Sequence, residues 1–179
     1  MIKQFTLLLI LICISVKSQI RYDTISFDKI KLNNTISLYT DFNYLKKIID
    51  DKETHAKVYT GKDIQIPFVA FDDDDIIYTV FSNNLVFNYK EENPNKIYIS
   101  YIKTNKNLTI QLKLDEKKYI TLNNNMALVM LKKYFKNSAL AFAKNGKIFR
   151  LIIRKENKYA YCDLIFRNKK FVEMYLIQK

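Results

Sequence analysis

The hydrophobic pattern of this chain predicts β-strands, through one segment of strict apolar and polar alternation and several short apolar or aromatic runs. The clearest case is residues 108–114, "LTIQLKL", in which every second residue is leucine or isoleucine. Such alternation places the apolar side chains on one face of a half-buried strand and the polar ones toward water. We expect this strand to connect two sheets, without a flexible linker.

Six further runs, rich in β-branched and aromatic residues, also predict strands, because these residue types pack well on a pleated surface. Turn-forming segments such as "SNN", "KEENPN" and "RNKK" separate them. The predicted strands are residues 75–81, 84–89, 96–102, 147–154, 159–166 and 171–177.

Two segments carry the helical period instead, with apolar residues three or four positions apart. Thr40 precedes the first segment and can cap its first turn. The apolar side consists of Phe42, Leu45, Ile48 and Ile49 in the first segment, and of Ala127, Leu131, Tyr134 and Phe135 in the second. Both segments predict amphipathic helices that lie on an apolar surface.

Each predicted helix follows a short strand and an asparagine turn, and the two copies are 90 residues apart. Ile30, Leu32, Asn33, Asn34 and Leu38 recur as Ile120, Leu122, Asn123, Asn124 and Leu128. This order predicts a duplicated α+β fold, with two tandem helix-plus-antiparallel-strand repeats in one compact domain. We place the first repeat at residues 19–102, and the connecting strand with the second repeat at residues 103–179. The alternative is a chance echo in a chain of biased composition.

The order of strand, asparagine turn, amphipathic helix and antiparallel strands, found twice in residues 28–179, resembles the BLIP-like architecture. That group includes secreted β-lactamase inhibitor proteins, which are tandem α+β repeats, and SmpA/OmlA-type envelope lipoproteins. The family's glycine near the helix end, its disulfides and its lipid-bearing cysteine are missing here. The resemblance therefore implies an architecture only, and neither β-lactamase inhibition nor any binding residue is carried over.

Residues 1–18 have the features of a secretory signal peptide. Lys3 precedes an apolar run from Phe5 to Val16, and Val16 and Ser18 take the positions before a cleavage site. The run is shorter than the roughly 20 residues that cross a bilayer. We therefore expect a secreted or periplasmic protein without a transmembrane helix after cleavage. Lipidation is disfavoured, because Cys13 lies in the middle of the apolar run.

The formal charge of +12 comes almost entirely from lysine, and arginine occurs only at Arg21, Arg150, Arg154 and Arg167. Specific recognition of phosphate usually depends on the forked geometry of arginine. The lysines are also scattered along the chain, as on a solvated surface. This pattern argues against nucleic acid and leaves attraction to an acidic cell-surface polymer or an acidic protein partner.

Four consecutive carboxylates, Asp72 to Asp75, form the most conspicuous short motif. An EF-hand loop would need a central glycine and a glutamate at its twelfth position, and neither is present. In an extended segment only alternate side chains converge, so Asp72 and Asp74 are the weak candidates for a divalent cation. The other interpretation is a solvated acidic turn before a strand.

The remaining reactive residues predict neither an enzyme nor a cofactor site. Cys162 is the one thiol left after cleavage and lies among strand-forming residues, which predicts a buried, inert side chain. His55 is the single histidine and is interpreted as a surface loop residue, so no histidine-rich zinc site can form. Gly61 and Gly146 stand too far apart for a phosphate-binding loop.

We therefore expect an exported, non-enzymatic module that binds a protein in the envelope or outside the cell. The alternative is a cell-surface glycan-binding or hydrolytic protein, and the oligomeric state stays open. Hydrolysis would need two carboxylates in a cleft, drawn from Glu53, Asp63, Glu91, Glu92 and Asp163. The candidate binding residues are Asn83, Asn84, Asn168 and Lys169 at strand turns and the aromatic residues Tyr98 and Tyr101.

Overall fold

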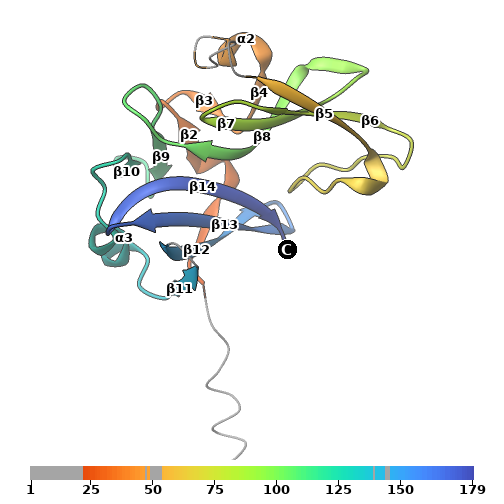
Figure 1. Cartoon of the computed structure of the whole chain (residues 1–179). Helices are drawn as coiled ribbons and strands as arrows, with labels where there is room; N and C mark the ends of the chain where they lie inside the picture. The colour runs from red at the N-terminus through yellow and green to blue at the C-terminus, as the bar shows by residue number, and fades with distance from the viewer. Residues whose placement is uncertain (1–21, 47, 49–53, 139, 144–145) are drawn as a thin grey trace, which may run out of the picture.

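The computed structural model describes residues 22–46, 48, 54–138, 140–143 and 146–179. Within these ranges the chain forms two β-sheets and a few short helical segments (Figure 1). The predicted signal peptide, residues 1–18, lies outside the described residues.

The larger sheet has ten strands in the described part of the chain. Its path runs β1-β12-β13-β14-β8-β7-β6-β5, with β11 beside β12 and β4 beside β8. All neighbours are antiparallel except β1 and β12. The strands are β1 (Thr24–Ser26), β4 (Tyr39–Asp41), β5 (His55–Thr60), β6 (Ile76–Phe81), β7 (Leu85–Lys90), β8 (Asn93–Lys103), β11 (Leu140–Ala143), β12 (Gly146–Lys155), β13 (Lys158–Arg167) and β14 (Lys170–Gln178).

All six strands predicted from apolar and aromatic runs are confirmed as β6, β7, β8, β12, β13 and β14. These strands lie next to one another in the larger sheet, where cross-strand pairs of large side chains stabilise them. The predicted boundary between residues 102 and 103 falls at the end of β8. Each predicted repeat also pairs with the other, because β1 lies beside β12 and β14 beside β8.

The smaller sheet has the order β10-β9-β2-β3. Its strands are β2 (Ile30–Leu32), β3 (Ile36–Ser37), β9 (Ile110–Lys113) and β10 (Tyr119–Leu122). The alternating strand of residues 108–114 is therefore confirmed as β9, but it forms the centre of a second sheet instead of connecting two sheets. Ile30 and Ile120, which are 90 residues apart, both pair with Leu112, one from each neighbouring strand.

The asparagine turn after β2 adopts the left-handed backbone that its sequence predicts. Asn33 and Asn34 have φ angles of 45° and 70°. Asparagine tolerates this region better than most residues, because its short polar side chain can bond locally. The turn reverses the chain so that β3 pairs with β2.

The predicted α+β repeat fold is wrong. Strands hold 53% of the structure and helical segments 12%, so the fold is β-rich. The helical segments are α2 (Phe42–Leu45), α3 (Leu128–Tyr134) and the 3-10 turns η1 (Phe27–Lys29) and η3 (Gly61–Asp63). Part of the first predicted helix, residues 47 and 49–53, lies outside the described residues.

Strands supply most of the core, and the short helices add Leu45 of α2 and Leu128 and Leu131 of α3. After α3, the backbone N–H groups of Asn137 and Ser138 donate to the carboxylate of Asp23, at 2.8 and 2.9 Å. The chain has already left the helical conformation at Phe135, and these bonds hold the segment that follows beside Asp23, which precedes β1. The apolar face of the larger sheet is then covered by the smaller sheet, whose alternating strands suit that role.

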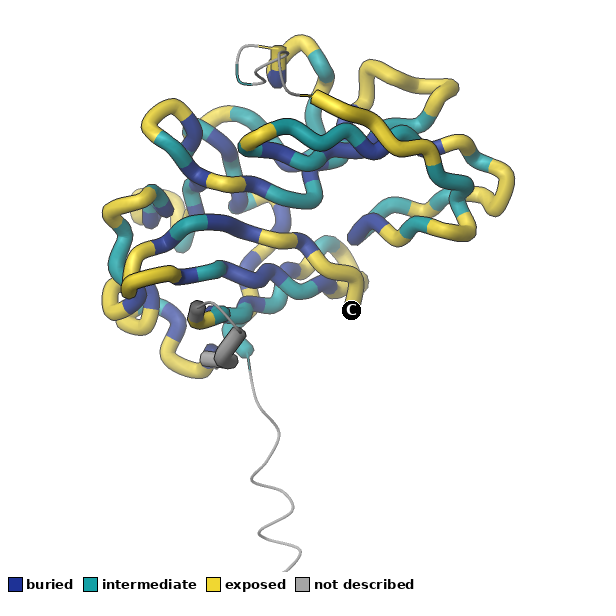
Figure 2. Tube along the Cα trace, viewed as in Figure 1, coloured by how far each residue is buried: buried dark blue, intermediate teal, exposed yellow. Residues whose placement is uncertain are grey.

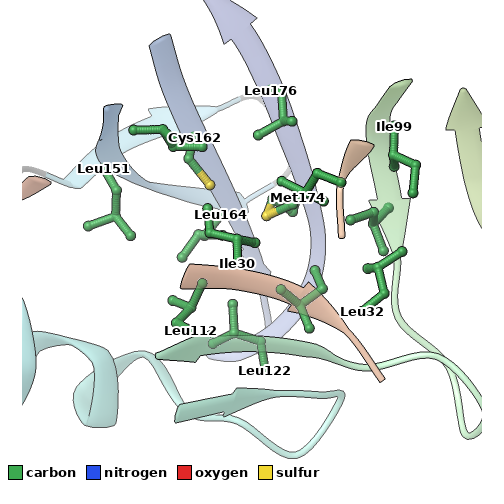
Figure 3. Packing of buried hydrophobic residues seen from close by; sticks show 14 of the residues in the cluster. Ile30, Leu32, Ile99, Leu112, Leu122, Leu151, Cys162, Leu164, Met174 and Leu176 are labelled. Carbon is green, nitrogen blue, oxygen red and sulfur yellow. The ribbon is translucent and has the colours of Figure 1, made fainter. Parts of the chain in front are cut away.

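The core lies between the two sheets. Figure 3 shows Leu112 and Leu122 of the smaller sheet directed toward Leu151, Leu164 and Met174 of the larger one. Buried and exposed positions alternate along the strands, as Figure 2 shows. One face of β12, β13, β14 and β8 is therefore committed to the core, and the other face is free to carry different chemistry.

Candidate functional site

The face of the larger sheet that points away from the core carries a continuous surface of tyrosine, arginine and isoleucine. Strand register sets its rows: Ile152 faces Tyr161, which faces Ile177, and in the next row Asp163 lies between Arg150 and Tyr175. Tyr175 in turn faces Tyr101 on β8. We call this surface the outer face, and its residues are Tyr101, Arg150, Ile152, Arg154, Tyr159, Tyr161, Asp163, Arg167, Glu173, Tyr175 and Ile177.

Every arginine in the described part of the chain belongs to the outer face, and Arg150 is the most firmly held. Its Nε and Nη2 atoms donate to the two carboxylate oxygens of Asp163, both at 2.6 Å. Its guanidinium carbon lies 4.5 Å from the ring centre of Tyr161. The bond to the buried carboxylate raises the pKa of Arg150, so this side chain stays charged and fixed in position.

A second ion pair fixes the neighbouring row. Arg167 Nη2 donates to one carboxylate oxygen of Glu173 and the Tyr101 hydroxyl donates to the other, each at 2.6 Å. The rings of Tyr101 and Tyr175 lie 4.7 Å apart. Burial, followed by the bond to Glu173, raises the pKa of Tyr101. Both oxygens of this buried carboxylate are therefore occupied by protein groups.

Around the ion pairs, large apolar surfaces remain in water. Tyr159, Tyr175 and Ile177 are 43%, 39% and 41% exposed. Positive side chains lie at the margin, including Arg154 and Lys179, whose Nζ is 5.7 Å from the ring centre of Tyr159. The outer face is therefore an exposed aromatic surface with a cationic margin, supported by buried, fully paired carboxylates.

The structure does not bring the predicted binding residues together. Tyr101 belongs to the outer face, whereas Tyr98 lies elsewhere on β8, with its ring 4.9 Å from that of Tyr39 in an edge-to-face contact. Asn83 and Asn84 form the β6–β7 turn. These residues therefore mark different surfaces of the molecule.

The other predicted turn pair, Asn168 and Lys169, closes the β13–β14 hairpin. Both have positive φ angles, 50° and 65°, which match the twist that two-residue hairpin turns require. The carbonyl of Lys169 accepts a bond from the N–H of Leu128, which connects the turn to α3. Their backbone therefore has a structural role at this turn.

The sequence did not single out Arg150, Tyr161, Glu173 or Tyr175 as site residues, and it offered Asp163 only as one of several carboxylates for hydrolysis. Their alternation along strands was visible, but the pairing of Arg150 with Asp163 depends on the register of β12 against β13. A signal was nevertheless present, because three of the four arginines fall between residues 150 and 167 in a chain otherwise rich in lysine.

The acidic motif forms the turn that precedes β6. The N–H of Asp75 donates to the carbonyl of Asp72, and the N–H of Asp72 donates to the Asp75 carboxylate at 2.7 Å. Lys90 lies 2.5 Å from that carboxylate, and this bond is the main cause that lowers the pKa of Asp75. No group of three or more potential metal ligands occurs among the described residues, so Asp72 and Asp74 gain no further support as a cation site.

Gly61 is required where this acidic turn crosses the end of β5. Its N–H donates to the carbonyl of Asp75 at 2.8 Å, and a side-chain carbon added to Gly61 would lie 1.9 Å from the carbonyl oxygen of Asp72. We expect Gly61→Ala to lower the free energy of unfolding by about 1–3 kcal/mol through this overlap. Urea denaturation of this variant beside Asp73→Ala, an exposed control, measures the effect. Equal stability of the two variants would contradict the packing described.

Carboxylates also line a hollow of about 300 Å³ beside this turn, including Asp72, Asp74, Glu91 and Glu92. A general acid in glycoside cleavage needs a raised pKa, whereas Lys90 lowers that of the adjoining Asp75. The other carboxylates considered for hydrolysis lie elsewhere. Asp163 is bound to Arg150. Asp63 accepts a bond from the Thr60 hydroxyl, and Glu53 lies outside the described residues.

His55 begins β5 and does not lie in a loop, which corrects the sequence interpretation. Its ring stacks on that of Phe81 in the neighbouring strand, with centres 4.8 Å apart. The contact between His55 and Phe81 stabilises the start of β5, because aromatic side chains that face each other on adjacent strands attract one another.

Cys162 is fully buried in the core beside Leu151 and Leu176, which confirms the predicted burial. Burial raises the pKa of its thiol. We therefore expect a Cys13→Ser chain to be unreactive toward Ellman's reagent at pH 8 until it is unfolded in guanidinium chloride. Rapid labelling of the native chain would show that β13 opens readily or that the thiol is accessible.

Comparison with known proteins leaves the site to be interpreted from its own geometry. No protein-family model, no curated protein and no solved structure matches the chain. The resemblance to the BLIP-like group therefore stays a prediction. Among the described residues, no helix has the length and apolar character needed to cross a membrane.

Proposed function

We propose that this chain is an exported, non-enzymatic binding protein whose outer face recognises a protein in the envelope or outside the cell, through a contact surface that is acidic at its rim. The observation that carries the proposal is the cluster of Arg150, Asp163 and Tyr161, in which a buried carboxylate holds an arginine across an aromatic ring.

Tyrosine and arginine are the residue types that most often dominate binding energy at protein interfaces. Here Asp163 and Glu173 hold two arginines in place before a partner arrives. Such preorganisation reduces the entropy lost on binding. The exposed rings of Tyr159 and Tyr175 add apolar area that a partner can cover.

The charges of the outer face favour a protein partner over nucleic acid. Arg150 and Arg167 are already neutralised by carboxylates, which would repel a phosphate backbone. Arg154 and Lys179 remain at the margin without such a carboxylate among the described salt bridges. This arrangement favours an interface with an uncharged centre and an acidic rim on the partner.

The direct test is capture of partners from the native envelope by residues 19–179 attached to a resin. We expect one protein in stoichiometric amount, and its release as salt rises, because marginal charges are screened. Capture of nothing above background, or release of soluble glycan fragments by the chain alone, would refute the proposal.

A further inference from the structure

A groove of about 770 Å³, which shares no lining residue with the outer face, lies where four segments meet. Figure 1 shows the strands and the helix that these segments connect. Those segments are the β2–β3 turn, α2, the β6–β7 turn and the connection from β8 to β9. Its volume is within the range of roughly 300–1,000 Å³ that is usual for ligand sites. Asparagine lines it at five positions: Asn33, Asn43, Asn84, Asn105 and Asn107.

The composition of the groove differs from that of the chain. Asparagine supplies 17 of 179 residues overall but half of this lining. Charged residues make up 27% of the chain, yet none of the described lining residues is charged. Among the described residues of this strongly basic protein, the lining of this groove is uncharged and rich in amides.

Two of the asparagines build the wall of the groove. Asn33 donates through Nδ2 to the carbonyl of Asn107 at 2.9 Å, and its Oδ1 accepts from the N–H of Thr109 at 2.9 Å. Asn105 Oδ1 accepts from the N–H of Asn107 at 2.8 Å. These bonds connect the β2–β3 turn to the segment that leads into β9. The wall of the groove is therefore fixed before any ligand binds.

The other asparagines offer unused hydrogen-bonding groups. Within the described residues, the side-chain amides of Asn43, Asn84 and Asn107 have no protein partner. Each amide can donate two bonds and accept two, which complements a hydroxyl group that both donates and accepts. Tyr44, at the edge of the groove, is 61% exposed and offers a flat apolar surface.

We propose that this groove binds a neutral carbohydrate. Hydroxyl groups spaced along a sugar chain match the three free amides, and the apolar face of one sugar ring can cover the ring of Tyr44. The absence of charge in the described lining gives no counter-ion for an anionic ligand. The proposal does not depend on the protein-binding role of the outer face, because the two surfaces share no residue.

The test is isothermal titration of the chain with maltotriose, cellotriose, triacetylchitotriose and the anionic trigalacturonate. We expect at least one neutral trisaccharide to bind, with an affinity unchanged by 0.5 M NaCl, and trigalacturonate not to bind. Asn84→Ala and Asn107→Ala should each weaken binding roughly tenfold, because each removes a hydrogen bond without disturbing an internal one. Tyr44→Ala should have a similar effect.

Asn95→Ala, an exposed amide on β8 outside the groove, is the matched control and should bind as the unaltered chain does. Thermal melting of all variants separates loss of binding from loss of folding. The proposal is overturned if no neutral trisaccharide binds at millimolar concentration, if the groove variants bind normally, or if added salt abolishes binding. Outer-face substitutions should leave sugar binding intact, so failure here is distinguishable from failure of the proposed protein-binding role.

Discussion

Leu112→Ala is expected to lower the free energy of unfolding by about 3–5 kcal/mol, the cost of emptying a fully packed leucine site. Leu112 lies at the centre of the smaller sheet, with Ile30 and Ile120 on either side, and is completely buried. Figure 3 shows it directed into the contact between the two sheets. Its removal therefore leaves a cavity that strands cannot readily close. Urea denaturation followed by circular dichroism measures the change.

Leu114→Ala, two residues later and just beyond β9, provides the matched control. This leucine is only partly buried at the end of β9, so its truncation should cost less than about 2 kcal/mol. If both substitutions had the same small effect, the smaller sheet would not be the main cover of the core. The sheet-on-sheet account of the fold would then be contradicted.

Arg150→Ala and Tyr175→Ala are each expected to weaken partner binding by about 30-fold or more, the range of interface residues worth about 2 kcal/mol. Arg150 is held by Asp163, and Tyr175 packs against Tyr101, so both present a fixed surface. Tyr175→Phe should bind nearly as well as the unaltered chain if the ring, not the hydroxyl, makes the contact. Surface plasmon resonance with the captured partner gives the dissociation constants.

Tyr119→Ala is the control for these variants, because Tyr119 is 62% exposed on β10 and lies outside the outer face. Melting temperatures identify any variant that is simply unfolded, which matters for Arg150, since its loss leaves the buried Asp163 without its partner. Similar binding by the folded outer-face variants and by Tyr119→Ala would count against the proposed surface.

Strand positions could be predicted from the sequence because two-residue periodicity and β-branched side chains act locally. The run from Ile148 to Arg154 is rich in β-branched and aromatic residues, and β12 forms there. The two helices could not be predicted in length. Their apolar spacing fits a helix, but the chain leaves the helical conformation at Phe135. Asn137 and Ser138 then bind Asp23, which is more than 100 residues away in the sequence.

The proposed binding surfaces depend on contacts that only strand register and tertiary pairing define. Arg150 and Asp163 are 13 residues apart and meet because β12 and β13 form a hairpin. Asn84 is a candidate from the sequence because it lies in a turn. The fold places it in one groove with Asn33 and Asn107, which come from other segments. The sequence supplied the residue types, and tertiary pairing assembled them into surfaces.

The most direct test of partner recognition by the outer face is site-specific photo-crosslinking in the native envelope. A photoreactive phenylalanine analogue would replace Ile177 on the outer face or, as control, Val129 on α3, which is 71% exposed. We predict one dominant crosslinked protein from position 177 and none from position 129. Crosslinks from position 129 alone, or the same products from both positions, would contradict the account.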